Sequence, residues 1–308
     1  MLVLGAVAGS STVAAGPGVA APGPVSWPVP GWPPAQGAPD PHQVLAAAEA
    51  SRLLGLVAVA PGWRLDATAP SSLLAGPMSY PATPDLVDVA LVWSADEDAA
   101  SALSWIAHHP PAGSTVANGP DTDWRNGVML ESAFDDTYPS GSDAFESEQV
   151  DVAVVPLAGG AAGVRADAQV IWYPTRPAAE TVPPGERHVV VAVSAGSTIG
   201  AAPAVLSVRT LTDPVAVAEL ATKVDGMALQ VPGARSCPAG LASSPRLTLV
   251  FAGAAGVPEV RVVDDTGGCG EVTFAVGRTQ EPALVDGGLF HLVDRLLGVS
   301  LAGVDTPG

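Results

Sequence analysis

The stretch TDPVAVAELATKVDG, residues 212–226, opens the best-marked part of the chain and decides the architecture of its second half. Thr212 and Asp213 are residues that cap helices, and Pro214 suits a first helical turn, so an α-helix is predicted to begin here. Three strand-like runs and a short amphipathic helix are predicted downstream, at 246–252, 259–263, 271–276 and 284–297. This order predicts helices packed on one antiparallel sheet.

Both cysteines of the chain, Cys237 and Cys269, lie within this part. Two cysteines exclude a disulfide-dense scaffold, and without a C-x-x-C pair they supply no cysteine cluster for a metal. We therefore predict one structural disulfide, which would stabilise the fold by ~3–4 kcal/mol in the chain-entropy view. A disulfide requires an oxidising compartment.

The preceding part of the chain shows a related order of elements. The predicted helices and strands lie at 44–56, 86–93, 97–108, 127–134, 148–157 and 163–173. The Ala-Gly segment 158–162 is a hairpin signal between the last two strands, and Pro110 and Pro111 end the second helix. The shared order is compatible with an ancient duplication or with two independent solutions for a helix on a sheet.

Together these patterns predict an α+β protein of two modules, each an antiparallel sheet with packed helices. Residues 1–15 are apolar and then small, as in the later part of a secretory signal. The predicted organisation is a signal-like segment, a Pro/Gly-rich linker, a first module, a second module with the disulfide and a short tail, at 1–15, 16–41, 42–186, 187–300 and 301–308.

The composition excludes several classes of partner. The chain has 308 residues, of which 48% are hydrophobic, so there is ample material for two cores. It has 31 acidic against 13 basic residues and a net charge of −18. Such a surface repels phosphate backbones, so nucleic-acid binding is not expected. No apolar run reaches the ~18 residues of a membrane-spanning helix, so no integral span is expected.

Alternation in 163–173 points to the candidate ligand-facing residues. Arg165 and Asp167 share one face of the predicted strand, and that face is mostly polar, so we expect it to be the wetter face of the sheet. The default interpretation of the two residues is a surface ion pair, and the alternative is a pair that faces a ligand. Trp124 is the third candidate ligand-facing residue, because exposed aromatic residues are common in binding surfaces.

Other combinations of residues carry no recognisable chemistry. The acidic segment 134–148 lacks the register of an EF-hand and is predicted to be a solvated loop. The adjacent His108 and His109 are expected to stabilise the C-terminus of a helix rather than to share a metal. There is no nucleophile elbow, dinucleotide fingerprint or phosphate-binding loop. We therefore predict no catalytic residue, no cofactor and no metal site.

The segment GVRADAQVIWYPTRPAAETVPPG, residues 163–185, resembles one that recurs in uncharacterised secreted proteins and lipoproteins of actinobacteria. The matching residues are Arg165, Asp167, Ala168, Val170, Trp172, Arg176, Pro177, Glu180, Pro184 and Gly185. The second half is similar too, including the Ser236-Cys237-Pro238 turn and a late Gly-Cys-Gly. The resemblance implies an extracytoplasmic location and the disulfide, and it implies no activity.

These observations favour a secreted or cell-envelope protein that binds a partner, such as an envelope or cell-wall component, without catalysing a reaction. The alternative is a hydrolase-like enzyme whose site has no familiar motif. A binding protein should expose an apolar patch or groove. An enzyme should bring titratable groups together in a cleft, for example His188, Asp167 and a serine.

Overall fold

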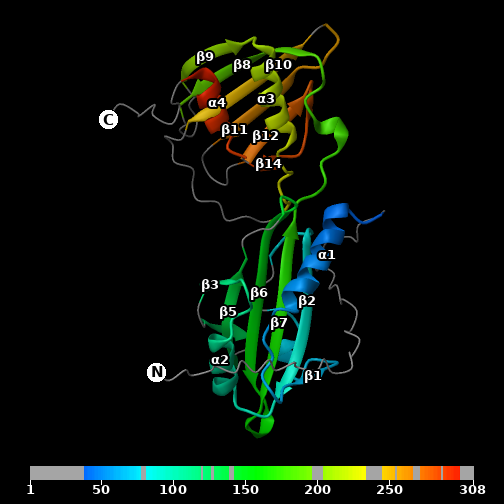
Figure 1. The fold of residues 1–308 in the computed structure, drawn as a ribbon, viewed down its shortest axis with the longest axis vertical. Helices are drawn as coiled ribbons and strands as arrows, with labels where there is room; N and C mark the ends of the chain where they lie inside the picture. The colour runs from blue at the N-terminus through cyan, green and yellow to red at the C-terminus, as the bar shows by residue number, and fades with distance from the viewer. Residues whose placement is uncertain are drawn as a thin grey trace, which may run out of the picture.

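The computed structural model describes residues 38–77, 81–118, 121–125, 128–138, 142–195, 204–233, 245–253, 255–265, 271–285 and 287–298. Within these residues the strands form two antiparallel sheets of seven strands each, and four α-helices accompany them. The first sheet and its helices form one end of the elongated molecule and the second sheet forms the other (Figure 1). The predicted α+β architecture with two sheet modules is confirmed.

The first sheet is centred on two long strands, β6 (Phe145–Pro156) and β7 (Ala162–Trp172), which pair along their whole length as the predicted hairpin. The short helix η2 (Ala158–Gly160) makes the turn. The strand order is β1-β2-β7-β6-β5-β3, and β4 pairs with β5. The other strands are β1 (Arg64–Asp66), β2 (Leu86–Ala95), β3 (Thr115–Asn118), β4 (Asp121–Arg125) and β5 (Val128–Thr137).

Two helices cover one face of this sheet. Helix α1 (Pro41–Leu54) is capped by Asp40, and helix α2 (Ala99–His108) is capped by Asp98, which accepts a hydrogen bond from the Ser101 amide. Carboxylates at these positions satisfy amides that have no partner inside the helix. The buried residues beneath the helices alternate along the strands, as a one-sided core requires: Val150, Val152, Val154, Val164, Ala166, Ala168 and Val170.

The second sheet has the order β13-β12-β11-β10-β8-β9, and β14 pairs with β12. Helices α3 (Pro214–Asp225) and α4 (Leu289–Leu297) pack on one of its faces. The strands are β8 (Glu186–Ser194), β9 (Val205–Leu211), β10 (Arg246–Gly253), β11 (Val260–Asp265), β12 (Glu271–Val276), β13 (Thr279–Gln280) and β14 (Leu284–Val285). Phe251 and Phe274 are the largest side chains of the core beneath the helices.

Several predicted boundaries need correction. The closing helix begins at Leu289 rather than at Leu284, because Leu284 is in β14 and its side chain is fully buried in the core. The second helix begins at Ala99 rather than at residue 97, because Asp98 is its capping residue. The acidic segment 134–148 is largely strand rather than solvated loop, since β5 and β6 extend into it and Asp135 pairs with Asp151.

The two modules differ in how their strands are ordered. In the first sheet the strand before the helix, β2, pairs with β7, the last strand of the β5-β6-β7 meander. In the second sheet the strand before the helix, β9, pairs with β8, and β8 in turn pairs with β10, the first strand of the β10-β11-β12 meander. The shared order of elements therefore produces two different topologies, which favours independent solutions over a duplication.

The segment between the two sheets is tied to helix α3. Arg176 lies over the Phe274 ring, 4.6 Å from its centroid, and its Nη1 donates to the Val224 carbonyl at 2.6 Å. The Val182 amide donates to Asp225 Oδ1 at 2.7 Å. A cation at the C-terminus of a helix is favoured by the helix dipole, so this arginine and Asp225 fix the chain as it enters the second sheet.

Candidate functional site

Six polar residues lie on the face of the first sheet opposite the two helices, and we call them the polar strip. They are Asp88 on β2, Arg165, Asp167 and Gln169 on β7, and Gln149 and Asp151 on β6. The register places Gln169 opposite both Asp88 and Gln149, and it places Asp167 opposite Asp151. Because paired residues in an antiparallel sheet point to the same side, the six side chains form one contiguous group.

The centre of the polar strip is an ion pair between Arg165 and Asp167. Nε of Arg165 donates to both carboxylate oxygens at 2.8 Å, and Nη1 donates to the Leu74 carbonyl at 2.9 Å. Arg165 is 3% exposed and Asp167 is 0% exposed. The predicted surface ion pair and the predicted wetter face are therefore wrong at these positions, since both charges are buried and partnered.

The cover over Arg165 is the connection between β1 and β2. Its short helix η1 (Ser72–Leu74) is capped by Ser71, and Leu74 packs with Ala153 and Val155 of β6. A Cβ added to Gly163 would meet the end of the Leu74 side chain at 2.9 Å, so glycine allows Leu74 to lie this close to β7. Alternation predicts which residues share a face of a strand, but it does not predict which segment packs on that face. The packing of η1 on this face was therefore not predicted.

Asp88 is the member of the polar strip whose carboxyl group has a raised pKa. It is 6% exposed, and neither carboxylate oxygen has a hydrogen-bond partner within the described structure. Burial and then repulsion from Asp167 raise the pKa of Asp88 to about 7, while the Arg165 guanidinium lowers it. The Asp88 carboxyl is therefore partly protonated near neutral pH, and it lies beside Asp167, which is paired with Arg165.

The remaining predicted site residues are not brought to this strip. Cys237 and Cys269 lie outside the described residues, so the disulfide stays a prediction. Trp124 pairs with Met129 across β4 and β5, where only the backbone is described. His188 is on β8 of the second sheet, whereas Asp167 is on β7 of the first. No group of three or more His, Cys, Asp or Glu in the described ranges has an arrangement suited to a metal ion.

His108 and His109 lie at the end of α2, as expected from the sequence. Their Nδ1 atoms are hydrogen-bonded to the Ser104 and Trp105 carbonyls at 2.6 and 2.7 Å. The His109 ring stacks on Trp105 with a centroid separation of 3.7 Å. Both rings satisfy carbonyls of the last helical turn, so their role is to end the helix.

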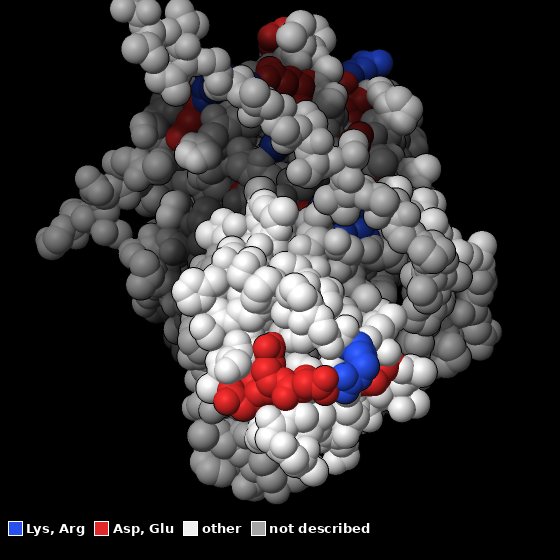
Figure 2. Space-filling view, turned by 60° about the horizontal axis from the view of Figure 1, so that its bottom comes forward, with Lys and Arg blue, Asp and Glu red and all other residues white. Residues whose placement is uncertain are grey.

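An acidic group marks the end of the first sheet near β1, where Figure 2 shows Asp and Glu side chains next to a basic one. Here Arg64 donates to both oxygens of Asp96, at 2.8 and 2.9 Å, and the Trp63 indole donates to Glu97 at 2.7 Å. Asp98 is occupied by capping α2. These carboxylates are engaged in joining β1 to the start of α2, so their cluster has a structural explanation.

The strand β9 is an apolar edge of the second sheet. Val205, Leu206 and Val208 are 64%, 46% and 51% exposed, and they are three of the eight large hydrophobic side chains exposed among the described residues. Within that part of the chain β9 pairs with β8 only, so it forms one end of the sheet (Figure 1). An edge strand of this length with a single charge, Arg209, offers both backbone groups and apolar contacts.

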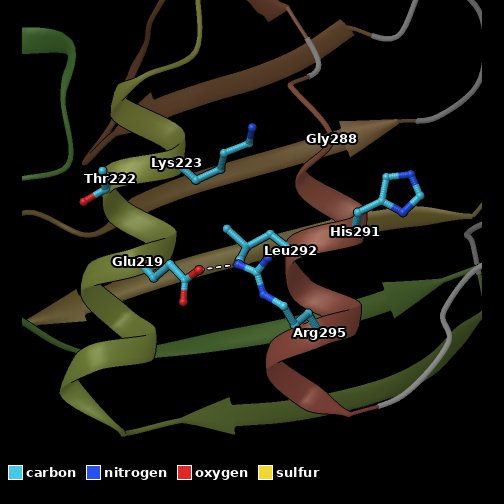
Figure 3. Close-up of a pocket in the computed structure, with 7 residues that line it drawn as sticks. All are labelled: Glu219, Thr222, Lys223, Gly288, His291, Leu292 and Arg295. Atoms are coloured by element: carbon cyan, nitrogen blue, oxygen red, sulfur yellow. Dashed lines mark hydrogen bonds and ion pairs between the residues drawn. The ribbon is translucent and has the colours of Figure 1, made fainter.

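A groove of about 360 Å³ lies between α3 and α4, and we call it the α3–α4 groove. Its lining comprises Glu219, Thr222 and Lys223 of α3 with Gly288, His291, Leu292 and Arg295 of the α4 region. In Figure 3, Leu292 points between the helices, Lys223 reaches toward Gly288, and the His291 ring points away from α3. An ion pair between Arg295 and Glu219 joins the two helices at the other end.

None of the helices in the described ranges is both long and apolar enough to cross a bilayer. Comparisons of this chain with models of protein families, with curated proteins and with solved structures gave no match. The likeness to actinobacterial secreted proteins therefore stays a prediction that rests on the motifs of 163–185 and of the second half.

Proposed function

We propose that the protein is a non-enzymatic binding protein of the cell envelope or the extracellular space, and that its partner adds an extended segment to strand β9. The observation that supports this most is the exposure of Val205, Leu206 and Val208 on one edge strand. In strand addition, backbone hydrogen bonds supply affinity and alternate side chains supply specificity. No acidic residue lies in 204–211, so this edge lacks the negative charge that dominates the chain as a whole.

Native proteins protect their edge strands by making them short or by placing charges on them. The opposite edge of this sheet, β13, has two residues, and the edge β1 of the first sheet has three. Strand β9 has seven residues and one charge, Arg209, so it is longer than these edges and has little protection by charge. A long apolar edge that a protein keeps exposed is more readily explained by a partner than by architecture.

One observation in the polar strip supports the alternative function, a hydrolase-like enzyme. Asp88 and Asp167 differ in environment as an acid and base pair does, because one has a raised pKa and the other is bound by arginine. Both are buried, however, and they present no open surface to a substrate. The geometry therefore favours binding over hydrolysis.

The test is capture from intact cells with the full-length protein and two matched variants. Val208→Lys places a charge on the β9 edge, whereas Val215→Lys places the same charge on α3 at a residue that is 72% exposed. The wild type and Val215→Lys should retain the same polypeptide, and Val208→Lys should lose at least ~90% of it because a lysine blocks strand addition. Equal capture by all three proteins would refute the role of β9.

The proposed location has its own test. The signal-like segment 1–15 and the cysteine pair are the sequence features that support it. Mass spectrometry of secreted material, with and without reductant, should show Cys237 and Cys269 joined. Two free thiols would contradict both the disulfide and the argument for an oxidising compartment.

A further inference from the structure

Lys223 is the only lysine among 308 residues, and it lines the α3–α4 groove. It lies in the last turn of α3, where the helix dipole favours a cation. In the described part of the chain its ammonium has no hydrogen-bond or ion-pair partner, and the side chain is partly buried. The helix dipole explains a cation at this position but not the open space beside it.

Gly287 allows the Lys223 side chain to lie close to the backbone before α4. A Cβ at this position would be 3.2 Å from Lys223 Nζ and 3.4 Å from its Cε. Gly287 is not among the glycines with positive φ, so the backbone does not require glycine here. The missing Cβ instead leaves room for the Lys223 side chain, whose ammonium then lies at the wall of the groove.

Among the described residues that line the groove, Lys223 is the basic residue whose side chain is not in an ion pair. Arg295 is paired with Glu219, and His291 points away from α3 (Figure 3). Leu292 supplies an apolar wall between the helices, and its side chain is largely buried. A site with one unpaired cation beside an apolar wall suits a ligand that is anionic at one end and apolar at the other.

We propose that the α3–α4 groove binds a small amphiphilic anion, with its carboxylate or phosphate on Lys223 and its apolar chain against Leu292. The volume of about 360 Å³ is in the range of small-molecule sites. The net charge of −18 does not prevent this, because at physiological salt charges more than ~8 Å away are largely screened. The site is independent of the β9 edge and of the function proposed for it.

The single lysine makes a direct measurement practicable. In protein labelled with ¹³C-lysine, every lysine side-chain signal belongs to Lys223. Titration with octanoate or octyl phosphate should shift the Cε signal saturably, at concentrations at least ~10-fold lower than inorganic phosphate needs, because the apolar chain adds ~0.8 kcal/mol per buried methylene. Octanol, which has no charge, should give no saturable shift.

Three variants complete the test. Gly287→Ala should weaken octanoate binding at least ~3-fold because the added Cβ displaces the Lys223 ammonium, while Gly76→Ala, where a Cβ would meet nothing within 4 Å, should leave it unchanged. Lys223→Met should abolish octanoate binding measured by calorimetry. The proposal is overturned if octanol shifts the signal as octanoate does, if no anion shifts it, or if Lys223→Met binds octanoate normally.

Discussion

The two sheets differ in the face that their helices do not cover. In the first sheet this face has the charged and amide residues of the polar strip, and it is buried, with Arg165 and Asp167 joined under the η1 segment. In the second sheet the corresponding face has valine and threonine, such as Val190 and Thr248, together with the Arg246–Asp265 ion pair, and it is partly exposed. An ion pair is thus buried on this face of the first sheet and partly exposed on the corresponding face of the second.

The difference shows that composition alone does not tell which face of a sheet is wet. A buried charge is tolerated when it is paired and hydrogen-bonded, as Arg165 is by Asp167 and by the Leu74 carbonyl. Partly exposed valines are tolerated because isolated apolar side chains on a surface cost little. What decides is which segment packs on the face, and in the first sheet that segment is η1.

The largest expected effect is on the buried ion pair. Arg165→Met leaves the Asp167 carboxylate buried without its partner, so the free energy of unfolding should fall by about 3–5 kcal/mol. Urea denaturation measures this directly. Arg64→Met, which removes an exposed pair with Asp96 in the same module, should leave the unfolding curve unchanged. If the two variants lost equal stability, the contrast in burial would be disproved.

The next effect is the change of stability with pH that results from the buried carboxyl group of Asp88. Its pKa is about 7 in the native protein and ~3.9 in the unfolded chain. The native state therefore holds a proton that the unfolded state lacks, and stability should decrease as pH rises from about 4 to above 7. Asp85, whose pKa burial raises to about 6, adds a change of the same sign.

Asp88→Asn removes this dependence at one position without changing the size of the side chain. The variant should be more stable than the wild type at pH 8, and its loss of stability between pH 5 and pH 8 should be smaller. The remaining slope should then reflect Asp85 and other carboxyls. Parallel pH profiles for the two proteins would show that Asp88 is charged and well solvated, contrary to its burial.

The smallest effect compares neighbouring valines on β8. Val191→Thr buries a hydroxyl in the core under α3 and α4, where Val191 is 1% exposed, and should cost about 1–3 kcal/mol. Val190→Thr points to the partly exposed face and should change stability by less than ~0.5 kcal/mol. Thermal or urea unfolding of both variants would show whether the outer face of the second sheet is as open as its exposure indicates.

Most of the elements could be predicted from local patterns. The helix at Pro214 follows from its cap and proline, the β6–β7 hairpin follows from alternation around an Ala-Gly turn, and both are confirmed. The closing helix was predicted too early because the apolar Leu284 fits a helical pattern as well as a strand. A short apolar run does not distinguish the two, and only pairing with β12 did so.

The candidate site was less predictable than the elements. Arg165 and Asp167 were identified as partners from their spacing. Their burial, however, depends on η1, whose Leu74 carbonyl accepts a hydrogen bond from Arg165 and lies 91 residues away in sequence. The α3–α4 groove was not predicted at all. Its only sequence signal was Lys223 as the single lysine, and its apposition to Gly287 required the two helices to be placed.

The sequence by itself determined where helices begin, where strands alternate and how acidic the surface is, because caps, turns and side-chain periodicity act over a few residues. Only the tertiary structure decided the order of the strands and which face each sheet buries. Those outcomes depend on contacts between distant segments, such as β2 with β7, β8 with β10 and η1 over the polar strip. They are set by which surfaces can cover one another, a property that no local stretch of this chain contains.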